Sequence, residues 1–82
     1  MSAPNLPYTV AEWRKNANEI VRVRLTIFEG HNLLEIRAYF REPCGRYRPS
    51  RKGINLSVSH LPAILEALED ARRAARSRGW LQ

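Results

Sequence analysis

Hydrophobic and polar residues alternate along two neighbouring stretches of the chain, residues 21–28 and 33–41. A period of two is typical of a β-strand with one buried face. Residues 29–32 lie between the stretches and put Gly30 at the first central position of a two-residue loop. A type II′ hairpin turn requires glycine at that position. The pattern therefore predicts a β-hairpin bent at Gly30-His31.

The loop length also predicts the register of this hairpin, because the turn type sets which residues face each other. Leu25 then lies opposite Ile36, and the apolar side chains of both strands share one side. On the other side Arg24 lies opposite Arg37. Like charges directly across a ladder repel each other, so the pair predicts an anionic ligand on this side. The same side also carries Arg22, Phe28 and Tyr39.

The flanking segments predict two further strands. Residues 8–15 fit either a helix, through a capping-box pattern, or a strand rich in aromatic and β-branched residues. We prefer the strand, because residues 15–18 then form a natural turn into the hairpin. Residues 42–45 have proline and glycine where a type I turn favours them, and residues 46–56 follow as an extended segment. Pro49 implies that this segment is an edge strand or contains a bulge.

The last part of the chain predicts one helix, because apolar residues recur at helical spacing over residues 61–75. Ser59 is the preferred N-cap and Ser57 the alternative, since Ser59 places Pro62 in the first turn, where no backbone donor is needed. Gly79 stands where a helix C-cap belongs. One helix covers only part of one face of a four-stranded sheet, so we expect a homodimer to cover the rest.

Length and charge narrow the class of protein. A chain of 82 residues makes one small domain. We interpret residues 1–7, with two prolines, as a flexible N-terminal arm and residues 8–82 as the one folded domain, with the helix at its C-terminal end. Fourteen Lys and Arg against eight Asp and Glu give a net charge of +6, which predicts a polyanionic partner.

Cysteine usage and the remaining polar residues exclude several functions. A single cysteine, Cys44, forms no internal disulfide or zinc-ligand set, so we expect no metal or cofactor. It indicates a reducing, cytoplasmic setting, on the nucleoid if the host is prokaryotic, with the nucleus as the alternative. No apolar run is long enough to cross a membrane, and the N-terminus lacks a signal-peptide pattern. Glu29 and His31 lack a visible nucleophile or second carboxylate, so we expect no catalytic residues and no enzyme.

A basic segment, residues 37–52, points to the kind of polyanion. It interleaves cations with aromatic residues, and it has one acidic residue, Glu42. Its cations are Arg37, Arg41, Arg46, Arg48, Arg51 and Lys52, and its aromatic residues are Tyr39, Phe40 and Tyr47. Cations that follow phosphates and rings that stack on unpaired bases are what single-stranded nucleic acid requires. The pattern therefore favours a single strand over a duplex.

Three pieces of this region carry a resemblance. Phe28-x-Gly30, then Ile36-Arg37-x-Tyr39-Phe40, then the run from Arg48 to Leu56 with its Pro-x-Arg-Lys-Gly-Ile string, resemble the positive cofactor four family of transcriptional coactivators. More narrowly, the chain looks like the short prokaryotic and phage members of that family, which consist of this domain alone. The resemblance implies an α+β fold, a strongly curved four-stranded antiparallel sheet followed by one C-terminal helix, in a homodimer. It also implies binding of single-stranded or melted DNA across β-ribbons with little sequence preference.

The resemblance implies roles for particular residues. Phe28 and Phe40 match aromatic residues that contact bases, although the register above puts Phe40 on the apolar side, where the core is the alternative. Arg37, Arg51 and Lys52 match cations that contact the backbone. With residues inferred from the pattern itself, the candidate nucleic-acid-binding set is Arg22, Arg24, Phe28, Arg37, Tyr39, Phe40, Arg48, Arg51 and Lys52.

The departures from the family concern the edge of the site. Glu29 stands where the family commonly has a lysine and His31 replaces another, so the loop edge is less basic, whereas Arg48 matches a lysine and keeps its charge. Phe40 replaces a tryptophan and should stack less strongly. The expected function is single-stranded DNA binding in transcription or DNA metabolism, with RNA or melted duplex as further targets. The alternatives are an RNA-binding module and a dimeric adaptor that docks an acidic segment of a transcription-machinery protein.

Overall fold

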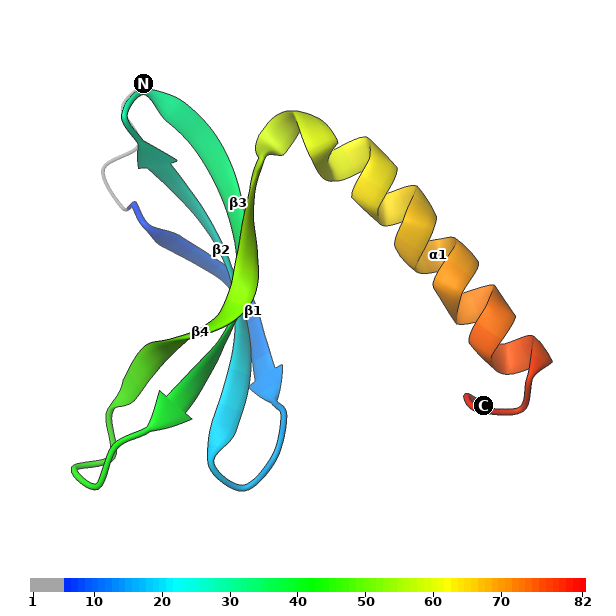
Figure 1. Ribbon diagram of the computed structural model, residues 1–82, viewed down its shortest axis with the longest axis horizontal. Coiled ribbons are helices and arrows are strands. Elements are labelled where there is room, and N and C mark those ends of the chain that lie inside the picture. Colours follow the sequence, from blue (N-terminus) through cyan, green and yellow to red (C-terminus); the bar gives the residue numbers. More distant parts are fainter. Residues whose placement is uncertain (1–5) are drawn as a thin grey trace.

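Four antiparallel strands and one helix make up the protein, in a computed structural model that describes residues 6–82 (Figure 1). The elements, in chain order, are β1 (Tyr8–Arg14), β2 (Glu19–Phe28), β3 (His31–Arg41), β4 (Tyr47–Ser57), the 3₁₀ turn η1 (Val58–His60) and α1 (Leu61–Ser77). The strands lie in the order β1-β2-β3-β4. The β-β-β-β-α prediction is confirmed, including the strand chosen for residues 8–15. Residues 1–5 of the predicted arm lie outside the described residues.

The turn between β2 and β3 differs from the prediction by one residue. The two loop residues are Glu29 and Gly30, and Phe28 pairs with His31. Both loop residues have positive φ, 50° for Glu29 and 78° for Gly30, as a type I′ turn requires. The predicted type II′ turn at Gly30-His31 is therefore wrong, and every pair across the hairpin is shifted by two residues.

This shift leaves each residue on the face of the sheet that was predicted for it, but it changes which residues pair across the two strands. Leu25 lies opposite Leu34, so the apolar residues of both strands still share a side. Arg24, however, lies opposite Glu35, and Arg37 lies opposite Arg22. The predicted pair of Arg24 and Arg37 is wrong, because the turn begins one residue earlier than the glycine position suggested.

A bulge interrupts the pairing of β3 with β4. Arg37 pairs with Gly53, but Tyr39 pairs with Pro49, so three residues of β4 stand against Ala38 of β3. As expected for a strand containing proline, β4 is an edge strand. Gly53 has no room for a side chain, because a Cβ there would lie 2.6 Å from the Ile36 carbonyl oxygen. The close approach of β3 and β4 therefore depends on glycine at this position.

The helix begins differently from the prediction and ends as predicted. The Ser57 hydroxyl accepts a hydrogen bond from the Ser59 amide, so Ser57, the alternative cap, begins η1 and the prediction for Ser59 is wrong. Pro62 lies in the first turn of α1. Gly79 follows the helix with φ of 76°, and the Trp80 amide donates to the Ala75 carbonyl, which forms a Schellman motif.

The core is small, because α1 runs away from the sheet instead of covering it (Figure 1). The buried hydrophobic residues are Ile20, Leu34, Ala38 and Tyr39. No described residue of α1 is buried, and Leu65 and Leu68 of its apolar stripe are 62% and 58% exposed. The expectation that the helix packs on one sheet face is therefore not met within a single chain. None of the helices among residues 6–82 is long and apolar enough to span a membrane.

Candidate nucleic-acid interface

Glu35 lies at the centre of a charged network on the basic side of the sheet. Its carboxylate accepts a hydrogen bond from Arg24 Nε at 2.6 Å and another from Arg37 Nε at 2.8 Å. Arg24 reaches it from β2, whereas Arg37 lies two residues along β3, on the same face of the strand. The protein thus supplies its own anion between these two arginines.

Arg37 is held by three partners. Besides Glu35, its two terminal nitrogens donate to the Ser50 carbonyl oxygen and to Asn55 Oδ1, each at 3.1 Å. Its side chain is only 15% exposed. The expectation that Arg37 contacts phosphate rests on an unneutralised pair of arginines across the ladder. Arg22 does lie opposite Arg37, but Glu12 and Glu35 each neutralise one of the two. The geometry makes Arg37 a residue that fixes β3 to β4.

Arg22 covers the ring of Tyr39. The Arg22 guanidinium carbon lies 4.5 Å from the ring centroid, and Arg22 Nε donates to Glu12 Oε1 of β1 at 2.8 Å. Cation–π contact and an ion pair together fix the guanidinium. Tyr39 is only 3% exposed, so its ring is part of the core and is not free to stack on a base.

The Glu35 carboxyl has a lowered pKa. Burial by itself raises this pKa, because the charged form loses solvent. Hydrogen bonds from Arg37 and Arg24, together with their charges, outweigh the effect of burial and hold the pKa below its usual 4.5. Glu35 therefore stays ionised at neutral pH and neutralises part of the positive charge around it.

Two phenylalanines present their rings to solvent. Phe28, at the end of β2, is 62% exposed, and Phe40, near the end of β3, is 37% exposed. Phe28 shares its face of β2 with Arg22 and Arg24, since these residues alternate along the strand. Phe40 pairs with Glu19 rather than Val21, so it lies beyond the apolar residues of β2.

The bulge in β4 carries the other predicted cations. The Ser50 hydroxyl donates to the Ala38 carbonyl oxygen at 2.7 Å and accepts from the Lys52 amide at 3.1 Å, which holds the bulge. Arg51 is exposed and has no ion pair within residues 6–82. Lys52 Nζ lies 3.7 Å from Glu19 Oε2 and its side chain is 71% exposed. The bulge thus directs two solvated cations outward.

A comparison with protein families identifies residues 13–67 as the domain described as Transcriptional Coactivator p15 (PC4). The chain belongs to the PC4 family. Its domain is that of a nucleic-acid-binding, coactivator-type fold.

Solved structures show the same fold. A crystal structure of a PC4 homologue from Burkholderia pseudomallei, in an orthorhombic form, is similar with a TM-score of 0.77 and 25% identity, over 88% of this chain and 97% of that one. A tetragonal form of that homologue gives a TM-score of 0.72 and 23% identity, over 78% of this chain and 94% of that one.

The structure brings some of the predicted nucleic-acid-binding residues together and separates others. Arg22, Arg24 and Arg37 gather around Glu35 and Tyr39, whereas Phe28 and Phe40 lie near opposite ends of the hairpin. Arg48 lies in neither group, because its Nε is 3.4 Å from Glu42 Oε2 at the β3–β4 loop.

Sequence reasoning missed the polar residues that hold these side chains. Glu35 could have been found, because it lies on the same face of its strand as Arg37. Glu12, Ser50 and Asn55 gave no comparable signal, since their contacts depend on how β1 and β4 meet the hairpin. Among residues 6–82, no three His, Cys, Asp or Glu side chains lie close enough to hold a metal ion.

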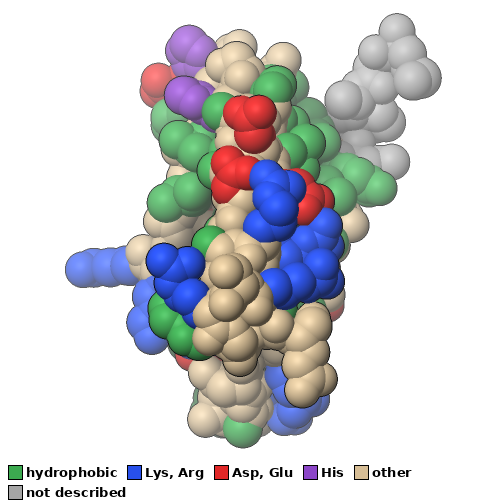
Figure 2. Space-filling view, turned by 90° about the vertical axis from the view of Figure 1, so that its right-hand side faces the viewer, with side chains coloured by type: hydrophobic (Ala, Val, Ile, Leu, Met, Phe, Trp, Pro, Cys, Tyr) green, Lys and Arg blue, Asp and Glu red, His purple; other side chains and the backbone are tan. Residues whose placement is uncertain are grey.

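Positive charge and apolar surface lie mainly apart on the side of α1 (Figure 2). In this view, Lys and Arg side chains gather mainly over the lower half, where the C-terminal end of α1 lies, and hydrophobic side chains flank the upper half. Arg72 and Arg73 at this end pair with Glu69 and Asp70 of the same helix. These pairs are exposed, so each contributes little to stability.

Proposed function

We propose that this protein binds single-stranded DNA, with little sequence preference, as a homodimer acting in transcription or DNA metabolism. The observation that carries the proposal is the exposed ring of Phe28 on the same strand face as two arginines, Arg22 and Arg24, whose guanidinium groups are already fixed. Fixed cations lose little freedom on binding phosphate, and an exposed ring offers a stacking surface to any base.

The remaining cations extend this surface. Arg51 and Lys52 lie exposed at the bulge, and the side chain of Arg48, which precedes the bulge in β4, is 65% exposed. None of these side chains is buried, so each can approach a phosphate without breaking the core. Stacking is insensitive to base identity, because every base has a π-face, which is why we expect weak sequence preference.

The homodimer follows from what one chain leaves uncovered. Large apolar side chains are exposed on the sheet, on α1 and just after α1: Val10, Trp13, Ile27, Ile54, Leu65, Leu68 and Trp80. A chain this small with so few buried side chains is marginal alone. A second copy would bury these surfaces. We propose a binding role without catalysis, in the cytoplasm or on the nucleoid of a prokaryotic host.

Fluorescence anisotropy with labelled oligo-dT, a matched duplex and a matched RNA strand tests the function. Oligo-dT should bind most tightly, and log Kd should rise with log salt by about 0.7 per neutralised phosphate. Phe28→Ala should weaken oligo-dT binding roughly 5- to 150-fold, the equivalent of about 1–3 kcal/mol per stacked base.

Phe28→Leu is the matched control, because it keeps apolar bulk and removes the ring. Equal Kd values for the parent and Phe28→Ala, both folded by circular dichroism, would contradict the stacking role. Tighter binding of RNA than of DNA would make RNA the target. Binding of an acidic peptide together with negligible binding of oligo-dT would favour an adaptor.

A further inference from the structure

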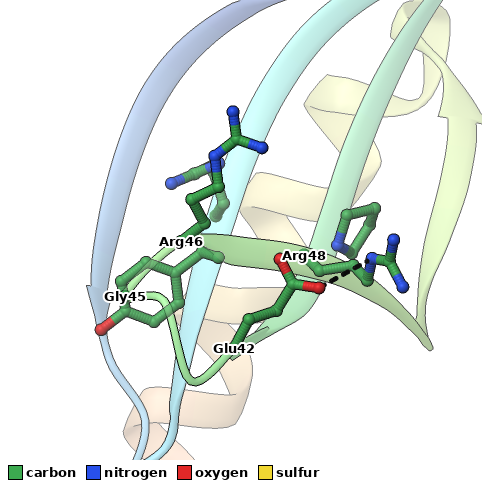
Figure 3. A pocket seen from close by; sticks show the side chains of 7 residues that line it. Glu42, Gly45, Arg46 and Arg48 are labelled. Carbon is green, nitrogen blue, oxygen red and sulfur yellow. Dashed lines mark ion pairs between the residues drawn. The ribbon is translucent and has the colours of Figure 1, made fainter.

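A hollow of about 410 Å³ lies between β2 and the loop that joins β3 to β4 (Figure 3). Its size is within the range of small-ligand pockets, about 300–1,000 Å³. Arg22 contributes from β2, and Arg46, Tyr47 and Arg48 contribute from the other side. Apart from Arg22 and Arg48, none of these residues belongs to the interface described above.

The lining of the hollow carries more positive than negative charge. Three arginines and one acid, Glu42, line it. Glu42 Oε2 lies 3.4 Å from Arg48 Nε at one side, and Figure 3 shows Arg46 apart from this ion pair. Arg46 has no ion pair among the described residues 6–82, and Arg22 keeps its two terminal nitrogens beyond the Nε bond to Glu12. Two guanidinium groups therefore remain for a phosphate.

The loop that carries Arg46 is held in shape by its own backbone. The Gly45 amide donates to the Glu42 carbonyl oxygen at 2.8 Å, and the Glu42 amide donates to the Arg46 carbonyl oxygen at 2.7 Å. Gly45 has φ of 95°, which other residues rarely adopt. The backbone that positions Arg46 is thus ordered before any ligand binds, which reduces the entropy cost of binding.

The hollow also has an apolar wall. Tyr47 is half-buried, and Pro49 also lines the hollow. Aromatic rings are the surfaces on which unpaired bases stack. Cations and a ring in one hollow match the two chemical parts of a nucleotide, its phosphate and its base.

We propose that this hollow binds one nucleotide of the single strand, with its phosphate between Arg22 and Arg46 and its base against Tyr47. The proposal rests on the proposed function and adds a subsite to it. Arg22, Arg24 and Phe28 follow one face of β2, and Arg22 also lines the hollow. A strand that runs along this face from Phe28 therefore reaches the hollow at Arg22.

The test measures Kd by anisotropy for the full-length protein with oligo-dT of graded length, and compares two variants. Arg46→Gln removes a cation that the described structure leaves without an ion pair, so it should fold, whereas Tyr47→Ala removes the ring. For strands long enough to reach the hollow, each variant should bind at least about 5-fold more weakly than the parent. For the shortest strands that bind, Kd should be unchanged. Arg76→Gln, in the last turn of α1, is the matched control and should not change Kd at any length.

The outcomes separate this subsite from the proposed function. If both folded variants match the parent at every length while Phe28→Ala still weakens binding, the subsite is wrong and the proposed function stands. If the parent binds no single strand, both are overturned. Competition with thymidine monophosphate distinguishes a free nucleotide from a strand. If thymidine monophosphate binds the parent but not the variants, while both variants bind long strands as tightly as the parent, the hollow binds a free nucleotide only. That result would also overturn the proposal.

Discussion

Glu35 holds two arginines in place at the cost of some positive charge. Its carboxylate binds Arg24 and Arg37 through their Nε atoms, and the terminal nitrogens of Arg24 have no hydrogen-bond partner among residues 6–82. Tyr39 lies beneath this network with its hydroxyl 3.5 Å from Glu35. A fixed guanidinium is a better phosphate ligand than a mobile one, because less side-chain entropy is lost on binding.

The stability of the protein should depend on the charge of Glu35. Its pKa is lower in the folded protein than in the unfolded chain, so its stabilising effect is complete above about pH 4.5 and is lost as pH falls through the folded pKa. Glu19, whose pKa is lowered by hydrogen bonds from Asn16 and Lys15, acts in the same direction. We expect the free energy of unfolding to fall steadily below pH 4.5, measured by urea titration across a pH series.

The substitution Glu35→Gln tests how much the charge of this carboxylate contributes to the free energy of unfolding. It leaves two half-buried arginines without their carboxylate, so we expect a loss of about 1.5–3 kcal/mol at pH 7 and a weaker dependence on acid. Glu69→Gln is the control, since its ion pair with Arg72 is exposed on α1 and contributes little. An equal acid dependence in the parent and in Glu35→Gln would contradict the role of this carboxylate.

The bulge between β3 and β4 is the element that connects the network to the outer cations. Ser50 bonds both strands through its hydroxyl, and its carbonyl oxygen accepts from Arg37. Gly53 allows the strands to close again beyond the bulge. Bulges redirect side chains at the edges of sheets. Here the bulge places Arg51 and Lys52 on the outside while Arg37 stays within.

Ser50→Ala tests this element. The substitution leaves the Ala38 carbonyl and the Lys52 amide without their partner, so we expect a loss of about 1–2 kcal/mol, or a fall in Tm of about 4–8 °C per kcal/mol for a domain of this size. Binding of oligo-dT should weaken as well, since Arg51 and Lys52 lose their fixed direction. Ser77→Ala, at the end of α1, should change neither Tm nor Kd. Unchanged Tm and Kd in Ser50→Ala would show that the bulge does not need the hydroxyl.

On the scale of the whole molecule, residues 6–82 leave apolar surface uncovered on the sheet and on α1. On the sheet, Val21, Ile36 and Ile54 border a hollow of about 330 Å³. On the helix, Leu65 and Leu68 are exposed, and Trp80, which follows the end of α1, is 78% exposed. Large exposed apolar surfaces on soluble proteins mark interaction sites. A second copy of the chain is the partner we propose for them.

Light scattering across a concentration series tests this assembly. The parent should have twice the 9.5 kDa mass of one chain and should dissociate on dilution. Leu68→Glu places a charge in the helix stripe, where Leu68 is 58% exposed, so it should shift the mass to that of a monomer and lower Tm. Ala63→Glu, on another side of the same helix, is the control. A parent that stays monomeric at every concentration would contradict the homodimer.

Local pattern by itself determined the four strands, the helix, its Gly79 C-cap and the two faces of the hairpin, because alternation with a period of two assigns each residue to a face. It did not determine the register, since two registers that differ by two residues share the same faces. The backbone of Glu29 and Gly30 decided between them.

Tertiary structure alone decided which candidate residues are free to bind. Arg37 finds its partners 13 and 18 residues away, across a bulge that no local pattern predicts in detail. Tyr39 became core because Arg22 of the neighbouring strand covers its ring. Alternation cannot distinguish an arginine that points into solvent from one held by a carboxylate, because both occupy the same face. That distinction comes from contacts between strands that only the folded sheet brings together.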